Sequence, residues 1–314
     1  MHVLKPLVFL LFSVLIISCD QRPTQTTEDM AEPKLKLMTL DPGHFHAALV
    51  QKEVYDNVDS VVNVYAPEGK DLELHIDRIR GFNTRKENPT NWIEEVFIGP
   101  DFFEKMLKEK PGNVLVLSGN NAKKDDYIIR TINLGINVLA DKPMIISHDD
   151  FPTLVNAFQS AAENNVLLYD IMTERYEITT ILQKELSQIP EVFGQLLAGS
   201  AEQPAITKES VHHFFKYVSG KALIRPAWFF DVGQQGEGIV DVTTHLVDLV
   251  QWECFPEQVI DYQPDIELVT ARRWTTDLSP EEYKKVTGMS EFPEYLQKVV
   301  VVGIRNGYSK GEIM

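Results

Sequence analysis

Short apolar runs recur through the first half of the chain, and a stretch with helical spacing follows each of them. The runs are Leu35–Leu40, Val61–Ala66, Val114–Leu117, Val138–Ala140 and Val166–Tyr169. Strands covered on both faces lose the alternation of polar and apolar residues, so runs of this kind are typical of parallel sheets. Strands that alternate with helices therefore predict an α/β fold with a doubly wound parallel sheet over residues 34–170.

The connecting segments carry the signals of helices. A helix is predicted from about Phe45 to Val54, after the turn at Asp41-Pro42-Gly43. Leu72, Ile76 and Ile79 share one helix face, and Gly81 is expected to end that helix.

The pattern changes after Tyr169. Longer segments with strand character, Phe193–Ala198, Val259–Tyr262 and Val299–Ile304, now alternate with loops and few helices. This pattern of strands, loops and few helices predicts a C-terminal α+β domain over residues 171–314, with a large and mostly antiparallel open sheet.

The first nineteen residues have the pattern of an export signal. Lys5 precedes an apolar run, Leu7–Ile17, that is too short to span a bilayer and ends in Ile-Ile-Ser-Cys19. The segment resembles a bacterial lipoprotein signal, which implies cleavage of residues 1–18 and lipidation of Cys19. Residues 19–33 are polar and acidic, as in a flexible tether, so a membrane-anchored lipoprotein of the cell envelope is expected. A plain secretory signal with an incidental cysteine is the alternative.

Charge and cysteine content exclude several classes of protein. The formal net charge is −16, which disfavours a protein that binds nucleic acid through phosphate contacts. The only cysteines are Cys19 and Cys254, too few for a disulfide framework or a cysteine-rich zinc module.

The turn after the first strand lies where a dinucleotide-binding, Rossmann-like fold carries its glycine-rich phosphate turn. Only Gly43 fits that pattern, because Asp41 occupies the first glycine position and His46 the third. After the second strand, Glu68 or Asp71 is a candidate carboxylate for ribose hydroxyls. Two alternatives remain for His44 and His46: a metal-binding pair, which needs further ligands at later strand ends, or two turn histidines without such a role. No metal is expected.

Three later segments carry a family resemblance. They are Ala140-Asp141-Lys142-Pro143-Met144, Glu174-Arg175-Tyr176 and Gly236–Asp248, which contains Asp241-Val-Thr-Thr-His245. In this order they resemble the glucose-fructose oxidoreductase / inositol dehydrogenase (Gfo/Idh/MocA) family, in its Bacteroidetes lipoprotein branch. Asp141 replaces the usual Glu of the first motif, and Glu237 replaces the middle Gly of the third.

The resemblance implies hydride transfer between NAD or NADP, held tightly, and a secondary hydroxyl of a small carbohydrate or glycoside. It also implies an assembly of identical chains through the C-terminal sheet, and a C-terminus longer than this chain has. The predicted cofactor-binding residues are Asp41, Gly43, His44, Phe45, His46, Ser118, Asn120, Asn121, Asp141, Lys142 and Pro143. The predicted substrate-binding residues are Arg175, Trp228 and Asp231.

The catalytic candidates also have a chemical basis of their own. Asp241 and His245 are four residues apart, so on a helix the carboxylate is able to fix the imidazole tautomer for acid/base work. Lys142, at a strand end, is placed to polarise a substrate oxygen. By spacing alone, a solvated lysine and a helical ion pair explain the same residues. A sugar-binding or scaffolding lipoprotein that retains the fold without redox activity is the alternative function.

Overall fold

The structure is a computed structural model that describes residues 34–210, 215–218, 220–274, 278–299 and 310–313. All of these belong to one compact unit, residues 34–314. The predicted signal and tether, residues 1–33, lie outside the described residues. In the described part of the chain, no helix is long and apolar enough to cross a membrane.

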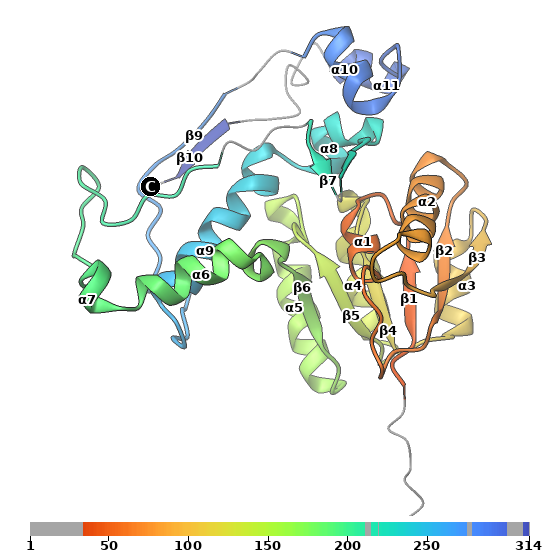
Figure 1. The fold of residues 1–314 in the computed structure, drawn as a ribbon, viewed down its shortest axis with the longest axis horizontal. Coiled ribbons are helices and arrows are strands. Elements are labelled where there is room, and N and C mark those ends of the chain that lie inside the picture. Colours follow the sequence, from red (N-terminus) through yellow and green to blue (C-terminus); the bar gives the residue numbers. More distant parts are fainter. Residues whose placement is uncertain (1–33, 211–214, 219, 275–277, 300–309, 314) are drawn as a thin grey trace, which may run out of the picture. The chain divides into compact units, whose positions relative to one another are not determined.

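A six-stranded sheet with the strand order β3-β2-β1-β4-β5-β6 organises the first half of the unit (Figure 1). Every neighbouring pair in it is parallel. The strands are β1 Leu37–Leu40, β2 Val61–Ala66, β3 Ile93–Ile98, β4 Val114–Leu117, β5 Asn137–Asp141 and β6 Leu168–Ile171. This order is that of a Rossmann fold, in which ligands bind at the carboxyl ends of the strands. The predicted doubly wound sheet is confirmed.

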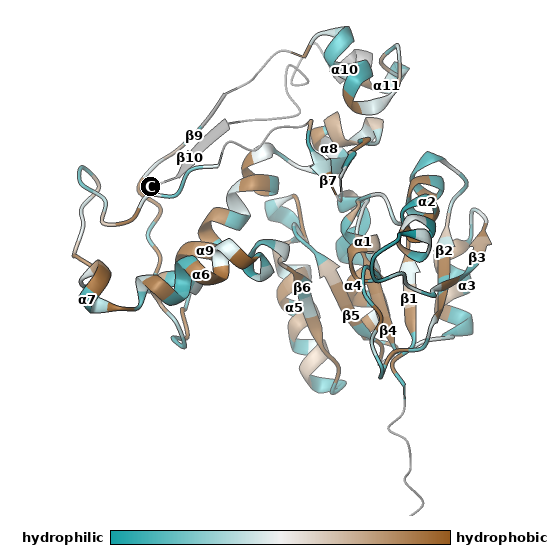
Figure 2. Ribbon diagram, in the orientation of Figure 1, coloured by the Kyte–Doolittle hydropathy of each residue, from teal (hydrophilic) through white to brown (hydrophobic). Residues whose placement is uncertain are grey.

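Helices cover both faces of the sheet, because successive strand residues point to opposite sides. The helices are α1 His46–Leu49, α2 Lys70–Thr84, α3 Phe102–Glu109, α4 Lys124–Ile132 and α5 Phe151–Glu163, with 3-10 turns at Asn121–Lys123 and His148–Asp150. Leu37 and Val116 pack with α1 and α2 in one core. Met38 and Leu115 pack with α3, α4 and α5 in the other. Figure 2 shows the apolar character of β4 and β5 between these layers.

The local predictions differ from the structure at three places. The helix predicted from Phe45 to Val54 is confined to the four residues of α1. Gly81 does not end its helix, because α2 continues through it to Thr84. Strand β3, which was not predicted, pairs with β2 at the edge of the sheet.

The second half is α+β, and among its described residues the antiparallel pairing is smaller than predicted. Its helices are α6 Ile178–Ser187, α7 Pro190–Phe193, α8 Val232–Gln235, α9 Thr244–Cys254, α10 Pro280–Thr287 and α11 Glu294–Val299, with 3-10 turns at Thr173–Tyr176 and Ala227–Phe230 and a π-helix at Ile239–Thr243. Its strands are β7 Tyr217–Val218, β8 Lys221–Ala222, β9 Ala271–Trp274 and β10 Lys310–Ile313.

Within the described residues, β7–β8 and β9–β10 form two separate two-stranded antiparallel sheets, where one large sheet was expected. Helix α7 ends at Phe193, and neither Leu196–Ala198 nor Val259–Tyr262 is a strand. Of the predicted strand Val299–Ile304, Val299 ends α11 and the rest lies outside the described residues. The predicted domain boundary at residue 170 stays a prediction.

Candidate functional site

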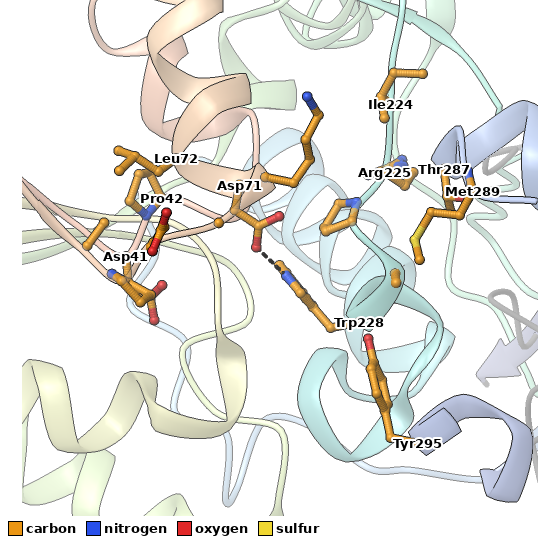
Figure 3. A pocket seen from close by; sticks show the side chains of 17 residues that line it. Asp41, Pro42, Asp71, Leu72, Ile224, Arg225, Trp228, Thr287, Met289 and Tyr295 are labelled. Carbon is orange, nitrogen blue, oxygen red and sulfur yellow. Dashed lines mark hydrogen bonds between the residues drawn. The ribbon is translucent and has the colours of Figure 1, made fainter. Parts of the chain in front are cut away.

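Two cavities lie at the carboxyl ends of the parallel strands. The first, of about 270 Å³, is here called the β2 cavity, and the second, of about 290 Å³, the β5 cavity. Asp41, Glu68 and Asp71 line the β2 cavity on the side of the sheet, and Trp228 and Tyr295 line it from the second half (Figure 3). The lining of the β5 cavity includes His44, Phe45, His46, Lys142, Glu174, Lys216, Asp241 and His245. Arg225 lines both cavities.

A tryptophan–carboxylate pair crosses the β2 cavity. The indole Nε1 of Trp228 donates a hydrogen bond of 2.6 Å to Oδ2 of Asp71 (Figure 3). Burial raises the pKa of Asp71 to about 6. Asp71 and Glu68 follow the end of β2, so both candidates for the ribose carboxylate lie at the predicted place.

Trp228 also lies against Gly43, in the turn after β1. A Cβ atom on Gly43 would lie 2.6 Å from Cζ2 of Trp228, so only glycine fits there while the indole keeps its position. Trp228, predicted to bind substrate, therefore lies at the β2 cavity, whereas Lys142 and His245 line the β5 cavity.

The three predicted catalytic residues come together in the β5 cavity. Lys142, Asp241 and His245 are all buried. The ammonium of Lys142 donates to Oδ1 and to the backbone oxygen of Asp241, both at 2.6 Å. Burial alone would raise the pKa of Asp241, but the Lys142 ammonium holds that pKa well below its usual range.

The spacing of Asp241 and His245 predicts that their side chains pair, but in the structure each side chain contacts another residue. Asp241 lies in the π-helix and His245 in the first turn of α9, so the two do not share an ordinary α-helical turn. The carboxylate of Asp241 accepts a hydrogen bond from the ammonium of Lys142, and Nε2 of His245 lies 3.8 Å from Oε1 of Glu174. Burial raises the pKa of Glu174. The cavity thus combines a buried lysine, an imidazole and a carboxyl group, the groups that acid/base chemistry on a hydroxyl requires.

Asp141, the last residue of β5, is the centre of a buried hydrogen-bond network. Its Oδ2 accepts from Nδ1 of His44 at 3.0 Å and from Oγ of Ser118 at 2.8 Å. Nδ1 of His46 lies 3.3 Å from the same oxygen. The ammonium of Lys124 lies 2.5 Å from Oδ1 and also donates to the backbone oxygen of Pro143. Lys124, which the sequence did not single out, is fully buried.

His44, His46 and Asp141 have the composition of a two-histidine, one-carboxylate metal centre, with ligand atoms within 4.8 Å of one another. The surrounding donors argue for a hydrogen-bonded cluster. Lys124 neutralises the Asp141 carboxylate, and Nη1 of Arg225 lies 3.4 Å from Nε2 of His44. Because a guanidinium only donates, Nε2 of His44 accepts, and Nδ1 carries the proton toward Asp141.

Asn120 and Asn121, two predicted cofactor residues in the turn after β4, form hydrogen bonds to neighbouring segments. Nδ2 of Asn120 donates to Oδ2 of Asp41 at 3.1 Å, and the hydroxyl of Tyr127 lies 3.3 Å from the same oxygen. Nδ2 of Asn121 donates to the backbone oxygen of Gln235 at 2.9 Å. The turn after β4 is therefore hydrogen-bonded both to the turn after β1 and to α8.

Two predicted substrate residues lie outside the linings of both cavities. Arg175 forms an ion pair with Asp248 of α9. The Asp231 side chain accepts from the backbone N–H of Gly233 and caps α8. Lys216 and Arg225 do line the β5 cavity, although no motif in the sequence indicated them.

The C-terminal part of the chain matches a known protein family. Residues 182–314 match the family described as "Putative oxidoreductase C terminal domain". No curated protein matches the chain.

Solved structures share the fold. A "putative oxidoreductase" from Parabacteroides merdae is 57% identical, with a TM-score of 0.81 over 89% of this chain and 66% of its own. A "putative oxidoreductase" from Thermotoga maritima is 14% identical, with a TM-score of 0.52 over 79% of this chain and 64% of its own. GenD2 from gentamicin A biosynthesis, in complex with NAD, is 17% identical, with a TM-score of 0.50 over 79% of this chain and 58% of its own.

The chain spans between 58% and 66% of the length of these proteins. The family match, the Parabacteroides structure and the confirmed strand order agree with the three ordered motifs. The chain is therefore similar to oxidoreductases over most of its length, and its three ordered motifs resemble the glucose-fructose oxidoreductase / inositol dehydrogenase family.

Proposed function

We propose that the protein is an oxidoreductase that transfers hydride between a nicotinamide cofactor, NAD or NADP, and a secondary hydroxyl of a sugar or glycoside. The observation that carries this proposal is the convergence of Lys142, Asp241 and His245 on one cavity at the end of β5. The mature protein is held in the cell envelope by a lipid on Cys19.

Each of the three residues has a role in this chemistry. His245 is the acid/base that takes the hydroxyl proton during oxidation and returns it during reduction. Lys142 donates to the same oxygen and stabilises the negative charge that develops on it. Asp241 keeps Lys142 charged and oriented, because the two groups are buried together.

The residues present fit a dinucleotide at both of its ends. At the β2 cavity, Glu68 and Asp71 offer carboxylates to ribose hydroxyls at the end of β2. At the β5 cavity, Lys142 and His245 would lie beside a bound nicotinamide, which would supply or accept the hydride. GenD2, which shares the fold, is bound to NAD, and this supports a nicotinamide cofactor here.

The experiment that tests the function begins with the purified protein as isolated. Denatured extract is analysed for released NAD or NADP, since a tightly held cofactor is expected to co-purify. The protein is then titrated with both nucleotides, and sugars and glycosides are screened for a change in nicotinamide absorbance. His245→Ala is expected to abolish turnover while nucleotide binding persists. Absence of nucleotide in the isolated protein, together with no binding at millimolar concentration, would exclude the redox function.

The contact between Trp228 and Gly43 favours one alternative, a sugar-binding or scaffolding lipoprotein without redox activity. The indole covers the glycine over which a Rossmann fold ordinarily places the phosphates. Sugar binding by calorimetry without any nucleotide binding would support that alternative.

A further inference from the structure

The turn after β1 offers a diphosphate unusually few backbone donors. In a Rossmann fold, free N–H groups of this turn and of the following helix bind the phosphates. Here the N–H of Gly43 donates to the backbone oxygen of Asp41 at 2.8 Å, and the N–H of His44 donates to that of Ser118 at 3.0 Å. Helix α1 has only four residues. The charge of a diphosphate must therefore be met by other groups.

Arg225 is placed to meet that charge. It is 3% exposed and is the residue that lines both cavities, so its side chain lies at their junction. In the β2 cavity it belongs to the wall opposite Asp41 (Figure 3). Its guanidinium carbon lies 4.2 Å from the ring centre of Phe229, and Nη1 lies 3.4 Å from Nε2 of His44. These contacts hold the guanidinium beside the β1 turn.

Two more cations lie near Arg225. The ammonium of Lys216, in the β5 cavity, lies 5.1 Å from the ring centre of Phe45. Burial and the nearby Arg225 and Lys142 lower the pKa of Lys216 to about 8. Burial and Arg225 likewise lower the pKa of Arg78, on α2. In the described part of the chain, neither Lys216 nor Arg78 forms an ion pair. Asp241 and Glu174 offset part of the charge of Lys216, and Asp71 offsets part of that of Arg78. Partly buried cations that form no direct ion pair are expected to attract an anionic ligand.

We infer that the diphosphate of a dinucleotide binds at the junction of the two cavities on the guanidinium of Arg225, with Lys216 and Arg78 supplying further positive charge. Side chains thus replace the glycine-rich turn. This inference rests on the proposed function and identifies which residues hold the cofactor. A dinucleotide suits the junction because it carries a nucleoside on each side of its diphosphate, one for each cavity.

Calorimetric titration with ADP-ribose, which carries the diphosphate without nicotinamide, tests the inference. Each lost charge-assisted contact is expected to weaken binding of ADP-ribose about ten- to a hundredfold. The variants are Arg225→Gln and Lys216→Gln; Arg78→Gln, at a residue that lines neither cavity, should have a smaller effect. The matched controls are Arg80→Gln, on the exposed face of α2, and Lys221→Gln, on exposed β8; both should bind as the unaltered protein does. Binding of adenosine, which lacks phosphate, should be unchanged in every variant, and this distinguishes a lost contact from misfolding.

A second readout is the amount of nucleotide that co-purifies with each variant. Lower retention in Lys216→Gln, whose side chain is only partly buried, supports the inference even if Arg225→Gln fails to fold. Unchanged affinity for ADP-ribose in Lys216→Gln and Arg225→Gln overturns it, while binding of NAD or NADP leaves the proposed function standing. If UDP-glucose binds in an Arg225-dependent way and ADP-ribose does not bind, the dinucleotide assignment is wrong. If the unaltered protein binds no nucleotide, the proposed function fails as well.

Discussion

The ammonium of Lys142 and the carboxylate of Asp241 form a buried ion pair of 2.6 Å between the end of β5 and the π-helix. The two residues are 99 positions apart in the chain. This pair joins the parallel sheet to the π-helix that leads into α9, the helix that carries His245.

We predict that Lys142→Met destabilises the protein by about 3–5 kcal/mol, because it leaves the Asp241 carboxylate buried without a counterion. The double variant Lys142→Met/Asp241→Asn should recover part of that loss. Urea denaturation measures both. Lys70→Met, which removes an exposed ion pair with Glu73, is the control and should leave stability unchanged. Equal loss in the single and double variants would show that the pair is not the cause.

The contact between Gly43 and Trp228 predicts a coupled pair of substitutions. Gly43→Ala should cost about 1–3 kcal/mol, because its methyl group would overlap the indole and displace it. In a Trp228→Leu background the same substitution should cost much less, which a double-mutant cycle measures. Gly81→Ala, in the interior of α2, is the control and should stabilise the protein by about 0.5–1 kcal/mol. Additive effects of the Gly43 and Trp228 substitutions would contradict the contact.

Dinucleotide affinity is expected to depend on pH through Lys216. The groups that act on its ammonium are Arg225, Lys142, Asp241 and Glu174, and its pKa is lowered to about 8. Below pH 8 the ammonium is charged and attracts phosphate. Above pH 8 it loses its proton in the free protein, so affinity should fall by up to about tenfold per pH unit.

Lys216→Arg should remove this fall, since a guanidinium stays charged throughout that range. Titrations between pH 7 and pH 10 check the prediction. A decline of the same size in Lys216→Arg would assign the pH dependence to another group.

Anchoring of the mature protein is expected to depend on Cys19, which lies outside the described residues. Cys19→Ala should move the protein from the membrane fraction to the soluble fraction, because the lipid-bearing thiol is gone. Cys254→Ala, in α9, is the matched control and should remain with the membrane. Detergent partitioning that is the same for Cys19→Ala and the unaltered protein would refute lipidation at this cysteine.

The strands of the parallel sheet could be predicted where they are buried on both faces. Val61–Ala66 and Val114–Leu117 match β2 and β4 residue for residue. Strand β3 escaped prediction because it is an edge strand whose sequence, Ile-Glu-Glu-Val-Phe-Ile, mixes charged with apolar residues. In the second half, strand propensity was misleading. Val259 is 97% exposed, so its apolar, β-branched character does not reflect burial in a sheet.

The motifs predicted which candidate catalytic residues lie together, but not how they are paired. Spacing alone favoured Asp241 with His245, and the π-helix, which no local signal indicated, alters that geometry. Arg225 was missed because its contact with His44 spans 181 positions. Such a contact depends on how the two halves pack, which periodicity and local motifs do not encode.

Asp141 and Lys142 are consecutive residues, yet each is fixed by a different part of the protein. Asp141 is held by the histidines of the β1 turn and by Lys124, whereas Lys142 is held by Asp241 of the π-helix. A single peptide bond therefore joins Asp141, which contacts the turn predicted to bind the cofactor, to Lys142, whose ammonium is predicted to contact the substrate oxygen. A ligand that draws His44 away from Asp141 would loosen one of the two anchors of this strand end, so we expect cofactor and substrate-oxygen sites to influence one another through these adjacent residues.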